Sequence, residues 1–197
     1  MSERLSLETS DGETLEARID SAETPRWFTV FCHPHPLHGG SMNAPLMISV
    51  TRRLVERGHA VLRFNFRGAG SSTGTHDFGN GEQLDVAAAI DEASSRGLPV
   101  GLAGWSFGAA TALRWLAGAA ADLPYAGIAP PPDFLPEEAG AGPKRIILGT
   151  RDQLIDADAL RHYCADKGID LVLTPGDHFF HGRGSKIGDL VGQALEV

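Results

Sequence analysis

The stretch LPVGLAGWSFGAATALRWLAGAA, residues 98–120, joins a short apolar run to an alanine-rich run through a turn of the form G-x-S-x-G. The first run, Val100–Gly104, has the length and character of a buried β-strand. The second run, Ala109–Ala120, is rich in residues that favour helices. The stretch therefore predicts a strand–turn–helix unit, the building block of a parallel sheet covered by helices.

The same order of strand and helix repeats along the rest of the chain. Leu5–Thr9 and Thr14–Asp20 are short alternating segments separated by an Asp-Gly pair, which predicts a hairpin. The periodicity predicts five further strands, at Trp27–Cys32, Ala60–Phe66, Tyr125–Ala129, Arg145–Gly149 and Asp170–Leu173. It predicts four further helices: one through Leu46–Val55 that ends near Gly58, one at Glu82–Ser95, one at Ala157–Lys167 behind an Asp156 cap, and one through Ile187–Leu195.

This alternation predicts an α/β fold with a doubly wound, mostly parallel sheet of about eight strands and an antiparallel hairpin at one edge. With 197 residues, we expect a single domain over residues 1–197. Pro130–Pro143, rich in Pro, Gly and Glu, can cross between neighbouring strands but is too short for a lid domain. We therefore expect an open site.

Charge and composition exclude several classes of partner. The formal net charge is −8 and the 17 Lys and Arg residues form no run, which argues against a nucleic-acid partner or an anionic membrane surface. No secretory signal precedes the first strand and no apolar window would span a membrane, so we expect a cytoplasmic protein. Cys32 and Cys164 are too few for a disulfide framework. We expect a small-molecule substrate and a monomer or homodimer.

Ser106 is the candidate nucleophile, because it occupies the centre of Gly104–Gly108. A sharp strand-to-helix turn exposes the central side chain at the edge of the sheet, and glycines are needed where a Cβ would collide with the neighbouring elements. The helix that follows presents free N–H groups to a developing oxyanion. The alternative is an ordinary turn in which the serine caps the helix.

A serine nucleophile needs a base, and the base needs a third group to orient it. Asp152 and His178 each come just after a predicted strand, so both should project over the sheet edge that carries Ser106. We predict that His178 is the base and that Asp152 is the acid.

Three neighbouring residues compete for these roles. Asp156 is an alternative acid, although the helix that it precedes gives it a sufficient role as a cap. His181 is an alternative base, but it lies farther from the strand end. Asp177, next to His178, is expected to shape a turn.

The loop after Trp27–Cys32 should supply one of two oxyanion donors. Proline lacks an N–H, which leaves the backbone N–H of His35 as the first choice in this loop and that of Leu37 as the fallback. The other donor should be the N–H of Phe107, the residue after the nucleophile.

Two other motifs have simpler interpretations. His33, His35 and His38 suggest a metal site, but no Cys, Asp or Glu accompanies them, so we expect them to pack around the mouth of the site. The glycine-rich loop Arg67–Gly74 lacks the spacing of a phosphate-binding loop, and we expect Arg67 to belong to a structural network. No metal or other cofactor is predicted.

The chain resembles the small, lidless serine hydrolases of the α/β-hydrolase superfamily, dienelactone-hydrolase-like in size, and most of all a bacterial subgroup of predicted esterases. The resemblance spans almost the whole chain and rests on Cys32-His33-Pro34, Gly39–Asn43, Arg63–Gly68, Gly81-Glu82-Gln83, Gly104–Gly108 and His178–His181.

The resemblance implies Ser106 as nucleophile, Asp152 as acid and His178 as base, with carboxylesterase-type activity on accessible acyl groups and no cofactor. The chain departs from the family pattern at Gly182–Ser185, whose glycines are expected to loosen the start of the last helix.

We thus expect a serine hydrolase that cleaves carboxylic esters of small acyl groups. A thioesterase or a small amide or peptide hydrolase would use the same residues on another substrate. A catalytically silent interaction module is the non-enzymatic alternative.

Overall fold

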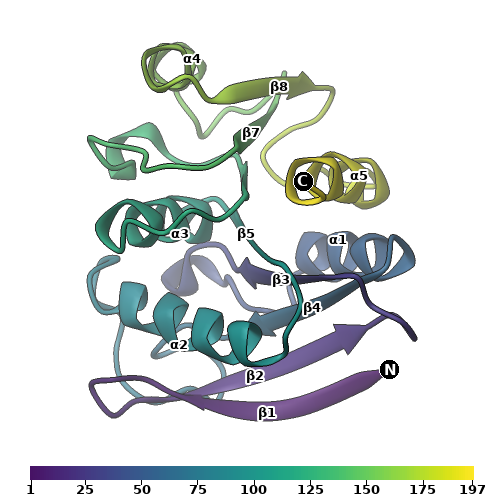
Figure 1. The fold of residues 1–197 in the computed structure, drawn as a ribbon. Helices are drawn as coiled ribbons and strands as arrows, with labels where there is room; N and C mark the ends of the chain where they lie inside the picture. The colour runs from purple at the N-terminus through teal and green to yellow at the C-terminus, as the bar shows by residue number, and fades with distance from the viewer.

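Eight strands form one mixed sheet in the computed structural model, which describes residues 1–197 (Figure 1). In chain order they are β1 (Ser2–Glu8), β2 (Thr14–Ser21), β3 (Trp27–Cys32), β4 (His59–Phe64), β5 (Val100–Trp105), β6 (Tyr125–Ile128), β7 (Lys144–Gly149) and β8 (Asp170–Thr174). They lie in the spatial order β1-β2-β4-β3-β5-β6-β7-β8. The β1–β2 hairpin is antiparallel, β2 pairs antiparallel with β4, and all other pairs are parallel. The predicted doubly wound sheet with an antiparallel edge is confirmed.

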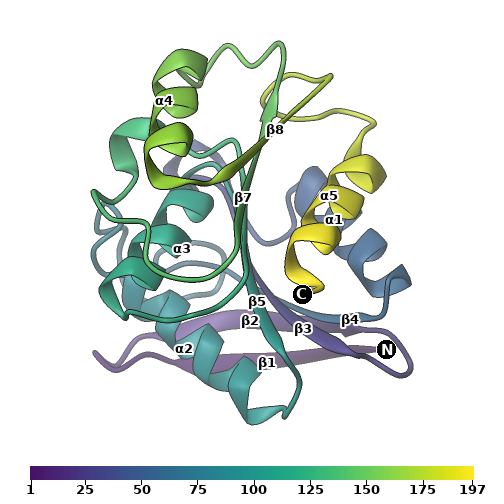
Figure 2. The same cartoon turned by 45° about the horizontal axis from the view of Figure 1, so that its top comes forward.

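Five helices cover the two faces of the sheet. They are α1 (Pro45–Glu56), α2 (Glu82–Ser95), α3 (Phe107–Gly118), α4 (Ala157–Lys167) and α5 (Gly184–Leu195). Figure 2 shows α1 and α5 on one face and α2, α3 and α4 on the other. The predicted Asp156 cap of α4 is confirmed, because its carboxylate accepts the N–H groups of Asp158 and Ala159. None of these helices has both the length and the apolar character needed to span a membrane.

The central strands are buried between the two helical layers. Val30 of β3, Leu102 of β5 and Ile147 of β7 have no exposed surface. Burial from both sides explains why these strands are continuously apolar instead of alternating. Each such side chain contributes roughly 1.5–3 kcal/mol by leaving water, so this layer anchors the strand ends from which the site is built.

The strand predicted at Ala60–Phe66 ends two residues earlier than expected, at Phe64. The backbone N–H of Asn65 donates to Glu16 of β2, and that of Phe66 donates to the imidazole Nε2 of His33. The chain therefore leaves the sheet at Asn65 to meet the loop that follows β3.

The last helix begins at Gly184, within the segment Gly182–Ser185. A Cβ on Gly184 would lie 2.2 Å from the Cβ of Ser49 in α1, and one on Gly188 would lie 2.6 Å from the Cβ of Arg53. Gly184 and Gly188 thus allow α5 to pack closely on α1.

Parallel strands bring their carboxyl ends to one edge of the sheet. The register pairs Cys32 with Gly104 and Gly149 with Thr174. The loops that follow β3, β5, β7 and β8 therefore leave the sheet at this edge, and they carry all the candidate site residues.

Candidate active site

Ser106 occupies a strained turn between β5 and α3. Its backbone angles are φ 54° and ψ −120°, a conformation that costs a non-glycine residue energy and that the surrounding structure must impose. Its side chain makes no capping hydrogen bond to α3. The interpretation of Ser106 as a helix cap therefore has no support, and the hydroxyl is left available at the edge of the sheet.

The two glycines of the pentapeptide allow this turn to be so tight. A Cβ on Gly104 would lie 2.5 Å from the backbone of Ala109, and a Cβ on Gly108 would lie 2.3 Å from the carbonyl oxygen of His33. Any other residue at these positions would push α3 away from β5 or from the loop after β3.

His178 and Asp152 meet above the same edge. The Nδ1 atom of His178 lies 2.9 Å from Oδ2 of Asp152, and both side chains are buried. The other carboxylate oxygen, Oδ1, accepts the backbone N–H groups of Leu154 and Ile155 at 2.9 and 3.1 Å. The carboxylate is thus held by three hydrogen bonds on two oxygens.

Electrostatics keeps Asp152 ionised. Burial raises its pKa, but the hydrogen bond from His178 and those from Leu154 and Ile155 outweigh burial, so the pKa lies below its ordinary value. An ionised carboxylate only accepts hydrogen bonds, so Nδ1 of His178 carries the proton. In the neutral imidazole, Nε2 is then free to accept a proton.

The structure gives the competing residues other roles. Asp156 is occupied as the cap of α4. Asp177 accepts the N–H groups of Phe179 and Phe180, so the predicted turn-forming role is confirmed. His181 is 79% exposed and lies 3.7 Å from Asp177, not beside Asp152.

Ser106 and His178 line one cavity of about 400 Å³. Its walls come from the loop after β3, from the start of α1, from the end of β5 and from the loops after β7 and β8: Pro34, His35, His38, Gly39, Gly40, Ala44, Pro45, Trp105, Leu154 and Phe179. Leu154 and Phe179 are 66% and 50% exposed, so the apolar part of the wall faces solvent. The cavity is open, without a covering lid.

Two backbone N–H groups are available beside the cavity. The N–H of His35 has no acceptor within the protein, and the N–H of Phe107, the first residue of α3, has no acceptor within its helix. The N–H of Leu37, the fallback donor, is directed to the imidazole Nδ1 of its neighbour His35 at 3.3 Å. Of the three N–H groups, only that of Leu37 is thus directed to an acceptor within the protein.

The three histidines after β3 do not converge. His33 is fully buried, with Nδ1 2.6 Å from the carbonyl oxygen of Pro34 and Nε2 accepting the N–H of Phe66. His35 and His38 stack on each other at a centroid distance of 4.5 Å. No group of three or more His, Cys, Asp or Glu side chains is arranged to hold a metal ion.

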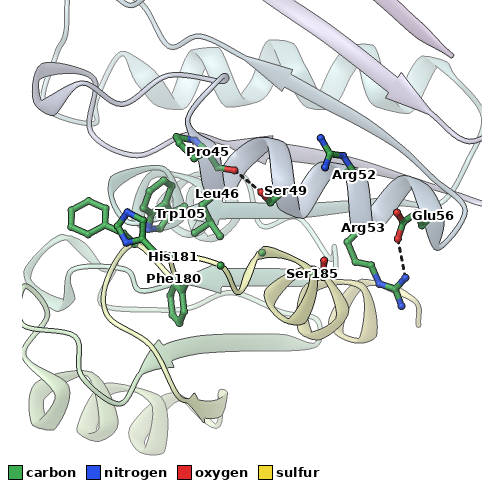
Figure 3. A pocket seen from close by; sticks show the side chains of 13 residues that line it. Pro45, Leu46, Ser49, Arg52, Arg53, Glu56, Trp105, Phe180, His181 and Ser185 are labelled. Carbon is green, nitrogen blue, oxygen red and sulfur yellow. Dashed lines mark hydrogen bonds and ion pairs between the residues drawn. The ribbon is translucent and has the colours of Figure 1, made fainter.

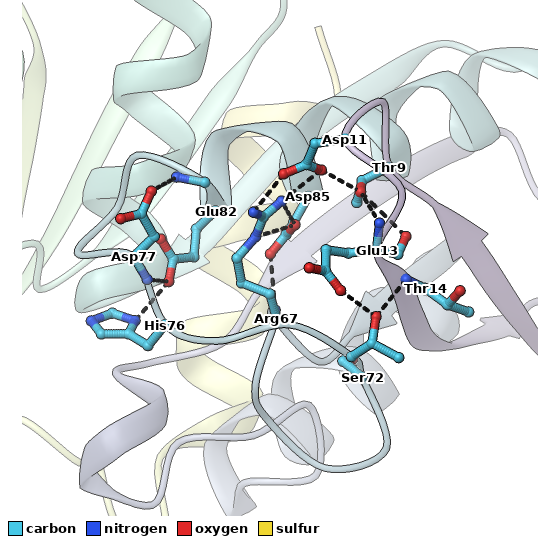
Figure 4. Close-up of polar contacts among 12 residues, drawn as sticks. Thr9, Asp11, Glu13, Thr14, Arg67, Ser72, His76, Asp77, Glu82 and Asp85 are labelled. Atoms are coloured by element: carbon cyan, nitrogen blue, oxygen red, sulfur yellow. Dashed lines mark hydrogen bonds and ion pairs between the residues drawn. The ribbon is translucent and has the colours of Figure 1, made fainter.

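The glycine-rich loop after β4 is anchored by Arg67, as the sequence predicts. Its guanidinium group bonds to the buried carboxylate of Asp85 in α2 at 2.8 and 3.0 Å and to Asp11 of the first hairpin at 2.8 and 3.1 Å (Figure 4). All three guanidinium nitrogens donate to these two carboxylates, so Arg67 ties the hairpin to α2.

A second cavity of about 280 Å³ adjoins the first and lies between α1 and the start of α5 (Figure 3). The two cavities share Pro45, Trp105 and Phe179. Beyond these three residues, the second cavity is also lined by Ser49 and Ser185.

The sequence did not predict the apolar wall of the site or the loop that carries His76. Leu154 follows Asp152 by two residues, and Phe179 follows His178, but nothing in their local pattern marks them as wall residues. His76, which packs against both His35 and Phe107, was also missed. Its contacts join loops far apart in sequence, so local periodicity carries no trace of them.

Comparison with known proteins identifies the family to which the chain belongs. Residues 29–182 match the model of the alpha/beta hydrolase family. The chain belongs to this family. The match runs from the third residue of β3 to the loop before α5 and includes Ser106, Asp152 and His178.

Individual relatives agree with this assignment. The chain is 32% identical to the uncharacterized protein RP471 of Rickettsia prowazekii, with 84% of this chain and 77% of that protein covered. The structure of XC6422 from Xanthomonas campestris, an α/β serine hydrolase without a lid, is 30% identical, with a TM-score of 0.87 and coverage of 99% and 94%. An α/β serine hydrolase homologue from Coxiella burnetii is 28% identical, with a TM-score of 0.87 and coverage of 98% and 97%. The protein is thus a lidless α/β hydrolase.

Proposed function

We propose that this hydrolase cleaves carboxylic esters of small acyl groups through Ser106, His178 and Asp152. One observation carries the proposal. A serine in a strained turn, with no capping role, shares a cavity with a histidine whose Nδ1 is bound to a buried, ionised aspartate. This arrangement meets the requirements of an activated serine nucleophile.

In the proposed acylation step, Ser106 Oγ attacks the ester carbonyl carbon, and its proton passes to Nε2 of His178. The imidazolium that forms is stabilised by Asp152, which keeps Nδ1 protonated and the ring oriented. The carbonyl π electrons move to oxygen, and the backbone N–H groups of Phe107 and His35 are the donors that would bind this oxyanion. Collapse of the intermediate expels the alkoxide, which takes the proton from His178.

Deacylation reverses these roles with water. His178 takes a proton from a water molecule, the resulting hydroxide attacks the acyl carbon, and Ser106 leaves with the proton returned from His178. The carboxylic acid product then departs, and the protein is regenerated without any oxidant or co-reactant.

The preference for small acyl groups follows from the shape of the site. The cavity of about 400 Å³ is open, and its apolar wall is formed by the exposed Leu154 and Phe179. Such a wall can cover a few methylene groups, but no enclosed apolar tunnel is present to bury a long chain.

A substrate panel tests this proposal. We expect p-nitrophenyl acetate and butyrate to be cleaved with higher kcat/KM than p-nitrophenyl decanoate. We also expect the butyrate ester to exceed the matched thioester and anilide. A clear preference for the thioester would replace the ester proposal with a thioesterase, and a strong preference for decanoate would contradict the small-acyl assignment.

A further inference from the structure

Three aromatic rings, from two loops and the start of α3, touch one another beside the site. The imidazole of His35 lies 4.9 Å from the ring of Phe107, measured between centroids. The imidazole of His76, from the loop between β4 and α2, lies 4.8 Å from His35 and 5.3 Å from Phe107. His76 therefore touches both residues whose backbone N–H groups are the proposed oxyanion donors.

The loop that carries His76 is held by Glu82, the first residue of α2. The Glu82 side chain has no exposed surface, and its two oxygens accept the backbone N–H groups of Asp77 at 2.9 Å and Gly79 at 2.8 Å. The carboxylate lies at the N-terminus of α2, where the helix dipole stabilises negative charge. Glu82 thus fixes the backbone on the C-terminal side of His76 (Figure 4).

Glu82 also contacts the His76 ring itself. Nδ1 of His76 lies 2.6 Å from Oε1 of Glu82, an approach that requires a proton on Nδ1, although the contact is not an aligned hydrogen bond. The His76 side chain is only 5% exposed, and Nε2 has no hydrogen-bond partner within the protein. Burying such a nitrogen unpaired is unfavourable, so a hydrocarbon ring would serve simple packing better.

The two proposed donors of the oxyanion hole come from a loop and from the start of a helix, so their relative position must be held by other contacts. His35 follows β3 and Phe107 begins α3, and the donors must stay within about 0.5 Å of their productive positions. Removal of one such donor costs about 10²–10³ in kcat, and a displacement of 1 Å costs about 10². A ring that contacts both residues from a third loop restricts their relative movement.

We propose that Glu82 and His76 form a positioning pair that keeps the two N–H donors of the oxyanion hole in a fixed position relative to each other. This inference rests on the proposed ester-hydrolase function. The His76 ring limits the movement of His35 and Phe107 because it contacts both, and Glu82 holds His76 in place. Neither side chain touches the substrate in this role.

The test compares His76→Ala with Phe78→Ala. Phe78 contacts the His76 ring at 5.1 Å from the outer side, is 69% exposed, and stacks on neither His35 nor Phe107, so it is a matched control for loss of a neighbouring ring. The measurements are kcat and KM for p-nitrophenyl butyrate and the inhibition constant of an alkyl trifluoromethyl ketone. That ketone adds to the active serine as a tetrahedral oxyanion, so its affinity reports the oxyanion hole directly.

We expect His76→Ala to lower kcat by about 10- to 100-fold and to weaken ketone binding by a similar factor, while KM changes less than about threefold. Glu82→Gln should change both quantities in the same direction, because the amide cannot accept both N–H groups and hold Nδ1 of His76. Phe78→Ala should stay within about twofold of the wild type.

Two results would overturn the proposal. One is a folded His76→Ala variant whose kcat and ketone affinity match those of Phe78→Ala. The other concerns His76→Phe, which keeps a ring but removes the contact with Glu82 and serves if the alanine variant does not fold: kcat and ketone affinity equal to those of the wild type would show that this contact does not position the ring. If the wild type itself neither hydrolyses esters nor binds the ketone, the proposed function fails instead.

Discussion

Asp152 and Asp156 lie four positions apart, and the structure gives them different partners. Asp152 binds His178 through Oδ2, whereas Asp156 accepts two N–H groups at the start of α4. The sequence could place both residues after a strand, and helix capping already favoured Asp152 as the acid. The hydrogen bond to Nδ1 now adds a geometric reason for the same choice.

Substitution separates the two aspartates. Asp152→Asn should lower kcat/KM for p-nitrophenyl butyrate by about 10³- to 10⁴-fold, because the amide would donate to Nδ1 and leave Nε2 protonated and unable to accept. Asp156→Asn should stay within about twofold of the wild type, since Asn caps helices as well as Asp does. A larger loss in Asp156→Asn than in Asp152→Asn would reverse the assignment.

Contacts between distant loops were the residue-scale features that sequence could not supply. Ser106, Asp152 and His178 could be proposed because each follows a strand, and parallel topology sends all strand ends to one edge. The contacts of His76 and the wall position of Leu154 depend on how loops pack after the sheet has formed. No periodic pattern encodes that packing.

At the scale of elements, the boundaries in the core were predictable and those at the site were not. Glu82–Ser95, Ala157–Lys167 and Trp27–Cys32 have the bounds expected from their periodicity. The helix predicted at Ala109–Ala120 instead begins at Phe107, because the strained turn at Ser106 brings the chain into helical geometry at once. Tertiary strain at the site thus overrode local propensity.

The packing of α5 on α1 makes a second prediction. A Cβ on Gly188 would lie 2.6 Å from Arg53 Cβ and 3.3 Å from the carbonyl oxygen of Val50, so Gly188→Ala should lower the free energy of unfolding by about 1–3 kcal/mol. The control is Gly118→Ala in α3, where no atom lies within 4 Å of the added Cβ. This change should be neutral or stabilise by up to about 1 kcal/mol.

Urea denaturation of the two glycine variants measures the difference. The midpoint should fall for Gly188→Ala and stay or rise for Gly118→Ala, with similar slopes. Equal stability of Gly188→Ala and the wild type would mean that α5 can move away from α1 without cost, against the close packing described above.

At the scale of the whole molecule, the buried His33 connects the loop after β3, which carries part of the site, to the chain that leaves β4. Burial lowers the pKa of His33 to about 4, although its hydrogen bond to Pro34 opposes the shift. Its Nε2 accepts from Phe66, so protonation would break the contact that holds the end of β4 against this loop.

This buried histidine predicts a pH dependence of stability. The unfolded chain binds a proton at His33 below about pH 6.5, whereas the native state does so only below about pH 4. The contribution to stability is therefore complete above pH 6.5 and is lost progressively as pH falls toward 4, by about 3 kcal/mol. In His33→Gln this contribution is absent, so its stability gap to the wild type should narrow over that range. Parallel curves in urea denaturation at successive pH values would contradict the prediction.

The central claim is that Ser106 is the nucleophile of an assembled hydrolase site, and covalent labelling tests it most directly. The wild type and Ser106→Ala are treated with a fluorophosphonate, and the labelled peptide is mapped by mass spectrometry beside a p-nitrophenyl butyrate assay. We predict one label per chain on Ser106 and loss of both label and activity in the variant. An unlabelled, folded wild type, or a label and activity that persist in Ser106→Ala, would contradict the account.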